Sequence, residues 1–191
     1  MNRARRALLS LPLTGALLVL GPFAGLTASA AAIGCTTPEL VAAIAAANVQ
    51  VGGGTVMLPS GCVYTLTVVN NTTDGGVALP VITGNVTIAG SGSTITRSTA
   101  SGTPPFRFLD VSSTGKLNID SLTLSNGLVN DGKNGGGAID SHGTLVVTRS
   151  MFSGNNAPAT SGTSGGAINN SGQLTVKTSL FVGNVAMEGG G

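Results

Sequence analysis

Short runs of alternating hydrophobic and polar residues recur through most of the chain. Val86-Thr87-Ile88, Leu117-Asn118-Ile119-Asp120 and Leu174-Thr175-Val176-Lys177 all follow this pattern. A period of two places the apolar side chains on one face of a β-strand and the polar ones on the other. Gly and Asn residues, as in Gly84-Asn85 and Gly154-Asn155, separate the runs and tolerate the backbone angles of tight turns. The pattern therefore predicts many short strands, each with one buried face.

Two segments near the C-terminus repeat each other at an offset of 29 residues. Residues 136–157 and 165–186 are identical at more than half of their positions, and each contains Gly-Gly-Ala-Ile followed by Phe-x-Gly-Asn. A third copy opens at Gly189, only 24 residues after Gly165. We therefore expect a unit near 24 residues that carries a surface loop of variable length. Repeats that cannot enclose a core alone are typical of solenoids.

Stacked copies of this unit can bury the apolar side chains that a single copy would leave exposed. Equivalent strands would pair in parallel at about 4.8 Å, with equivalent side chains in ladders along the interior. Because parallel crossover connections are overwhelmingly right-handed, we expect an all-β, right-handed parallel β-helix of roughly six coils. Phe152 should then stack on Phe181, and Asn155 should form an amide ladder with Asn184. The side chains predicted to face inward are those of Leu117, Ile119, Leu145, Val147, Leu174 and Val176.

One helix is predicted near the N-terminus, where it would cap the solenoid. Thr37-Pro38-Glu39 supplies a capping hydroxyl, a Pro at the first helical position and an acid in the first turn. Leu40, Val41 and Ile44 share one face, and Gly52-Gly53-Gly54 ends the helix. A solenoid needs such a cap because its first coil would otherwise expose an apolar cross-section.

The two cysteines, Cys35 and Cys62, predict one disulfide that fastens this helix to the first coil. Two thiols without a nearby His or second Cys pair cannot make a closed tetrahedral metal shell. We therefore assign residues 31–66 to the cap and first coil and residues 67–191 to the remaining coils.

Residues 1–30 have the features of a secretory signal peptide. Arg3 to Arg6 are cationic, Ala7 to Leu26 carry no charge and are mostly apolar, and small residues follow. Cleavage after Ala30 or Ala32 fits equally well, and both Sec and twin-arginine export remain open. The mature protein is expected to be secreted or held at the cell surface, without a membrane span.

Composition argues against several partners. Nine Lys plus Arg stand against seven Asp plus Glu, and three of the arginines lie in the signal segment. Nucleic acid binding needs clustered cations and stacking aromatics, whereas only 3% of the residues are aromatic. We expect no nucleic acid partner, no cofactor and no metal site.

Candidate catalytic residues are few. His142 follows Asp140 in a turn sequence that faintly resembles an element of polygalacturonases, but position 169, aligned with Asp140, is Asn. A glycosidase needs paired carboxylates, and no paired spacing is evident for Asp110, Asp120 and Asp131. His142 is therefore expected at the solvated surface.

The sequence gives even less support to a lyase or to a serine nucleophile. A lyase needs an Arg base and calcium-binding acids, whereas Arg97, Arg107 and Arg149 are predicted to be outward strand residues. Gly162-Thr163-Ser164-Gly165-Gly166 matches a nucleophile elbow by letters, but it lies in a variable loop and not between a strand and a helix. We assign no catalytic residue.

The quoted motifs resemble a known family. Leu40 to Tyr64, with its helix and glycine run, resembles the opening of secreted right-handed parallel β-helix proteins. The paired Gly-Gly-Ala-Ile and Phe-x-Gly-Asn segments resemble the repeat of the polymorphic outer membrane protein family. This resemblance implies an exported, often adhesin-like surface protein without a defined active site.

Three functions are therefore weighed. The leading hypothesis is a non-enzymatic, exported solenoid in adhesion or matrix contact, with a cell-surface or extracellular polysaccharide or protein as partner. The alternatives are a carbohydrate-active enzyme, either a polysaccharide lyase or a glycosidase, and a carbohydrate-binding module. Because Gly189-Gly190-Gly191 aligns with the start of a repeat, we also expect either a longer β-helix or self-association through an open C-terminal coil.

Overall fold

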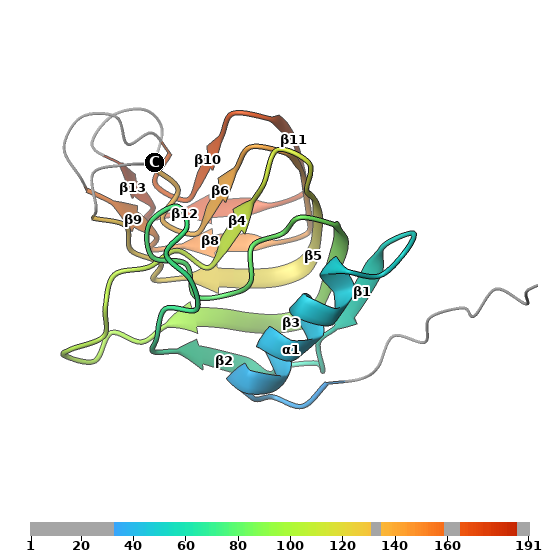
Figure 1. Ribbon diagram of the computed structural model, residues 1–191. Helices are drawn as coiled ribbons and strands as arrows, with labels where there is room; N and C mark the ends of the chain where they lie inside the picture. The colour runs from blue at the N-terminus through green and yellow to red at the C-terminus, as the bar shows by residue number, and fades with distance from the viewer. Residues whose placement is uncertain (1–32, 131–134, 159–164, 187–191) are drawn as a thin grey trace, which may run out of the picture.

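The chain folds as an all-β parallel solenoid of about four turns, with one short helix before the first strands. The computed structural model describes residues 33–130, 135–158 and 165–186. The strands stack in layers, and helix α1 (Thr37–Asn48) lies at the end opposite the last strands (Figure 1). The predicted signal peptide lies outside the described residues. In the described ranges, no helix is long and apolar enough to cross a membrane.

The largest sheet contains eight strands, five of which form its continuous path in the order β1-β3-β5-β7-β11. In chain order its members are β1 (Gly54–Met57), β2 (Val63–Leu66), β3 (Asn85–Arg97), β5 (Lys116–Ser125), β7 (Thr144–Thr148), β8 (Met151–Ser153), β11 (Gln173–Lys177) and β12 (Leu180–Val182). All pairings between these strands are parallel. Equivalent residues of successive coils therefore lie directly over one another.

Two smaller sheets form the other sides of the coil. One has the order β10-β6-β4, and the other pairs β13 with β9. Their bounds are β4 (Leu109–Val111), β6 (Ile139–Ser141), β9 (Asn156–Ala157), β10 (Ile168–Asn170) and β13 (Val185–Ala186). The turn number is lower than the six expected because the predicted unit of about 24 residues is wrong. Residues paired in successive coils are 28 to 32 positions apart, as in Gly54 with Val86 and Leu117 with Leu145.

The interior consists of the predicted ladders. Leu145 pairs in register with Leu117 below it and Leu174 above it. Leu117, Ile119, Leu145 and Val147 are fully or almost fully buried. Leu174 and Val176 hold the equivalent positions in the last coil, yet they remain 43% and 42% exposed. They are exposed because, among the described residues, no further coil pairs with β11.

Both predicted side-chain stacks are confirmed. The rings of Phe152 and Phe181 are parallel, with centroids 4.8 Å apart. The amide of Asn155 donates to the side-chain oxygen of Asn184 at 2.9 Å. Asn155 Oδ1 in turn accepts from the backbone N–H of Gly127 at 3.0 Å. The ladder thus satisfies buried backbone groups at one corner of the coil.

The glycines of the repeat mark a second corner where backbones approach closely. A Cβ on Gly172 would lie 2.0 Å from the carbonyl oxygen of Gly143, and one on Gly143 would lie 2.2 Å from that of Gly115. No side chain fits at these distances, so the stacking itself requires glycine in each coil.

Helix α1 covers the first coil. Leu40 and Ile44 are completely buried and Ala47 almost so, whereas Val41, predicted on the same face, is half-buried. The N-cap is Thr36, not Thr37, which lies inside the helix. Pro38 occupies the second helical position because the helix begins one residue earlier than predicted. Thr36 Oγ1 donates to the Glu39 carboxylate at 2.5 Å.

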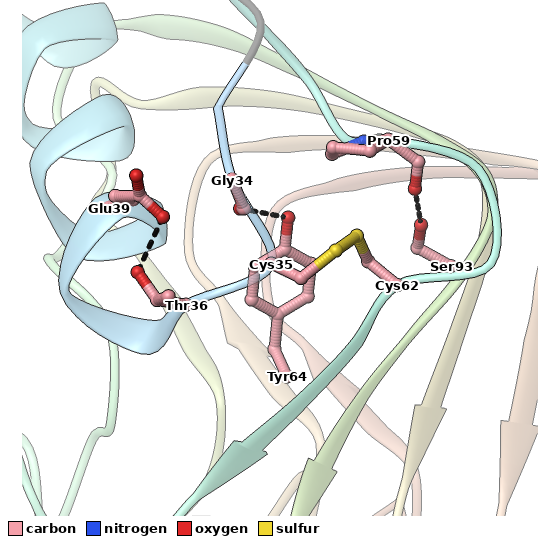
Figure 2. The surroundings of a disulfide bond; sticks show 8 residues. All are labelled: Gly34, Cys35, Thr36, Glu39, Pro59, Cys62, Tyr64 and Ser93. Carbon is pink, nitrogen blue, oxygen red and sulfur yellow. Dashed lines mark hydrogen bonds between the residues drawn. A yellow bond between two sulfur atoms is a disulfide. The ribbon is translucent and has the colours of Figure 1, made fainter.

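A disulfide joins Cys35 to Cys62, as the cysteine count predicts. The two Cα atoms lie 5.3 Å apart across a sequence separation of 27 residues. The Tyr64 hydroxyl donates to the Gly34 carbonyl at 2.9 Å beside it (Figure 2). These links hold the segment before the helix against the first coil, and a disulfide is compatible with an oxidising, extracellular compartment.

Candidate functional site

Polar residues gather on the outer face of the β10-β6-β4 sheet, where Asp74 also approaches. Alternation along β4 and β6 should leave their middle residues exposed, but every residue of both strands is buried. The connection before β3 pairs with the segment leading into β4, since Arg107 N–H donates to the Gly76 carbonyl at 3.0 Å. This contact brings Asp74 next to the sheet, and its carboxylate lies 3.5 Å from His142 Nε2.

A buried ion pair forms the base of this cluster. Arg107 Nη1 lies 2.5 Å from Asp140 Oδ2, and both side chains are completely buried. The other oxygen of Asp140 accepts from Asn169 Nδ2 at 2.9 Å. The prediction that Arg107 is an outward strand residue is wrong, because Arg107 precedes β4 and its side chain is completely buried. Such a pair is costly to break, since either partner alone would be a buried, uncompensated charge.

His142 lies between this buried pair and the surface. Its Nδ1 is 2.7 Å from Ser171 Oγ, and its Nε2 is 3.5 Å from Asp74 and 3.7 Å from Asp140. The side chain is 37% exposed. The prediction of a solvated turn histidine is therefore correct in part, because the ring also has fixed neighbours on both nitrogens.

Asp110 completes the cluster from the neighbouring strand. It pairs in register with Asp140, so both side chains leave the same face of the sheet one strand spacing apart. Asp110 is only 5% exposed, and its Oδ1 accepts no hydrogen bond. Burial raises the pKa of the Asp110 carboxyl, the charges of Asp140 and Asp74 raise it further, and Arg107 and His142 oppose the rise.

The sequence spacing predicted no pairing among Asp110, Asp120 and Asp131, but it did not compare Asp110 with Asp140. Asp110 and Asp140 are neighbours, and Asp74, which carried no sequence signal, approaches them. Asp120 lies apart and pairs with the exposed Arg149. Asp131 and residues 162–164 of the elbow-like motif lie outside the described residues.

The three arginines have different surroundings. Arg149 is exposed, as predicted. Arg97 is half-buried at the end of β3 and donates to the carbonyls of Thr103 at 2.7 Å and Pro104 at 2.8 Å. Its guanidinium also lies over the Phe106 ring, 5.6 Å from the centroid. Arg97 thus fixes the connection that follows its strand.

Asp110→Asn is expected to raise the melting temperature of the metal-free protein at neutral pH. The folded pKa of Asp110 lies above its ordinary value of 3.8, so the ionised form destabilises the folded state. Below pH 3.8 both folded and unfolded protein carry the proton, and this carboxyl makes no difference. As the pH rises through the raised pKa, the wild type should lose stability relative to the variant, after which the gap stays constant.

Calorimetry in the presence of a chelator, from about pH 3 to pH 8, measures this gap. Asp120→Asn is the matched control, because its carboxylate is paired at the surface. A gap for Asp110→Asn that closes with rising pH would contradict the assigned environment.

Comparison with protein-family models, curated proteins and solved structures finds no significant match to this chain. The fold and the contacts described above therefore carry the functional argument alone.

Proposed function

We propose that this chain is an exported, non-enzymatic solenoid that acts by contact, in an adhesin-like role, and that its last coil binds a second copy of the same coil. The observation that carries this proposal is the apolar side of β11 and β12. Three residues there continue the interior ladders, Leu174, Val176 and Phe181, and each has more than a third of its surface exposed.

This surface continues an existing interface. β11 packs on β7 in parallel, and its opposite edge has no partner strand among the described residues. Unpaired backbone groups and apolar ladders on one surface favour addition of another strand layer. Leu145 and Val147, one coil further in, illustrate the burial that a covering layer provides.

A closed pair of two copies fits this surface better than head-to-tail assembly into an endless stack. Head-to-tail growth requires a free first coil, but α1 covers that coil with Leu40 and Ile44. The open ends of two copies can instead meet about a two-fold axis, which gives a closed pair. Such homotypic contact could link molecules held on two surfaces, which is what an adhesin-like role requires.

The enzyme alternative has less support from the geometry. A glycosidase needs two carboxyl groups that reach the scissile bond. Asp140 is fully buried against Arg107, and Asp110 is 5% exposed, so neither can meet a polysaccharide. Asp74 and His142 are the titratable side chains described in this cluster that are more than a quarter exposed.

Sedimentation velocity over a range of concentrations tests the proposed contact. The wild type is expected to dimerise, and Val176→Lys should weaken the dimer at least tenfold by placing a charge in the apolar interface. Thr175→Lys is the matched control, since it puts the same charge one residue away on the outer face and should leave dimerisation nearly unchanged. A monomeric wild type, or equal dimerisation of both variants, would refute the proposal.

A parallel screen on pectin, alginate and related glycans tests the enzyme alternative. Turnover that His142→Ala abolishes would favour an enzyme over the contact role. His142→Ala is preferable to Asp140→Ala here, because loss of Asp140 would leave Arg107 buried without its partner and could unfold the protein.

A further inference from the structure

We propose that Asp74, Asp140 and His142 form a binding site for one divalent transition-metal ion, with Zn²⁺ as its probe. One ligand atom from each side chain lies within 4.8 Å of the others. The three residues come from separate parts of the coil: the connection before β3, strand β6 and the turn after β6. The fold therefore assembles the group, and the sequence alone predicted no metal site here.

The distances suit a shared ion. His142 Nε2 lies 3.5 Å from an Asp74 oxygen and 3.7 Å from an Asp140 oxygen. Two ligand atoms that each bind a tetrahedral ion at about 2.1 Å stand roughly 3.4 Å apart. Small side-chain movements would therefore bring all three atoms to bonding distance of one centre.

The surrounding contacts orient these ligands. When His142 Nδ1–H donates to Ser171 Oγ, at 2.7 Å, the lone pair of Nε2 faces the two carboxylates. A lone pair facing carboxylate oxygens is unfavourable unless a cation lies between them. Asp140 Oδ1 accepts from Asn169, and Oδ2, the oxygen near His142, accepts from Arg107, so Oδ2 would bind the ion through its second lone pair. Such hydrogen bonds commonly orient metal-ligating carboxylates.

Asp110 provides a second observation, independent of the three proposed ligands. Its carboxyl is nine-tenths buried or more, pairs in register with Asp140, and has an oxygen without a hydrogen-bond partner. Asp74 and Asp140 both act electrostatically on the Asp110 carboxyl, so a divalent cation held between them would offset the repulsion among these acids.

The donor set selects the class of ion. An imidazole nitrogen suits transition metals, whereas Ca²⁺ and Mg²⁺ prefer all-oxygen shells. His142 is the single histidine of the 191 residues, and both cysteines are in the disulfide. A nitrogen-containing zinc site can therefore form only around His142, which makes the test unambiguous.

Titration calorimetry of the full chain, purified without a histidine tag, provides this test. We expect one Zn²⁺ per chain, and at least tenfold weaker binding in His142→Ala and in Asp74→Asn. Asp120→Asn, which removes an acid outside the cluster, is the control and should bind as the wild type does. Ca²⁺ should bind more weakly than Zn²⁺.

Nitrogen-15 NMR of the single imidazole gives a second readout that does not depend on heat. Zn²⁺ should shift the Nε2 resonance and leave Nδ1 protonated. The absence of stoichiometric binding, equal binding by His142→Ala, or an Nε2 signal unchanged by Zn²⁺ would each overturn the proposal.

Discussion

Val147→Asp should unfold the protein or lower its stability by about 3–5 kcal/mol, the cost of an uncompensated buried charge. Val147 is completely buried in the ladder between Ile119 and Val176. A carboxylate there would have neither water nor a partner cation. Because whole domains are stable by only about 5–15 kcal/mol, a loss of this size removes much of the folded population.

Val146→Asp is the matched control. Val146 is the preceding residue of β7, is half-buried, and lies in register with the polar Asn118 and Thr175. Its side chain leaves the opposite face of the strand, so the same substitution should cost much less. Urea unfolding followed by circular dichroism measures both. Equal losses in the two variants would mean that the assigned faces of β7 are wrong.

Arg107→Met should be the most damaging single change in the polar cluster, with an expected loss of about 3–5 kcal/mol. Arg107 and Asp140 are both fully buried, so the substitution strands the Asp140 charge in the protein interior. Replacement of a buried ion pair by apolar residues of similar volume is often neutral or stabilising. The double variant Arg107→Met, Asp140→Leu should therefore recover most of the stability that Arg107→Met loses.

A double-mutant cycle measured by urea unfolding quantifies this coupling. If the two substitutions were additive, the pair would not be the interaction that stabilises this part of the solenoid. The double variant should also fail to bind Zn²⁺, because it lacks a proposed ligand.

The solenoid was predictable because its signal is periodic. Alternation correctly predicted that the side chains of Leu117 and Leu145 face inward, and the two residues pair in register. The 29-residue repeat placed Phe181 over Phe152, and the strand register pairs the same two residues. The exposure of Leu174 and Val176 follows from the same alignment. Leu174 aligns with the buried Leu145, but no described residues provide a further coil.

The polar cluster was not predictable in the same way. Alternation correctly places Asp140 on the outer face of its strand, but it cannot tell whether another segment covers that face. The covering connection, which includes Asp74, belongs to no repeat, so nothing in the pattern located it.

The sequence did contain one indication of this cluster, the alignment of Asp110 with Asp140. Leu109-Asp110-Val111 aligns with Ile139-Asp140-Ser141 as an acid between buried neighbours, and the strand register pairs the two acids. A search for stacked acids, and not only for nearby ones, would have found Asp110 beside Asp140.

Hydrogen–deuterium exchange at low and high protein concentration tests the central claim, contact through the last coil, most directly. If two copies meet through β11, amides of Gln173–Lys177 should become protected as the concentration rises, while those of the interior β5, Lys116–Ser125, exchange equally at both concentrations. Exchange in β11 that does not depend on concentration, in a protein whose β5 is well protected, would contradict the account.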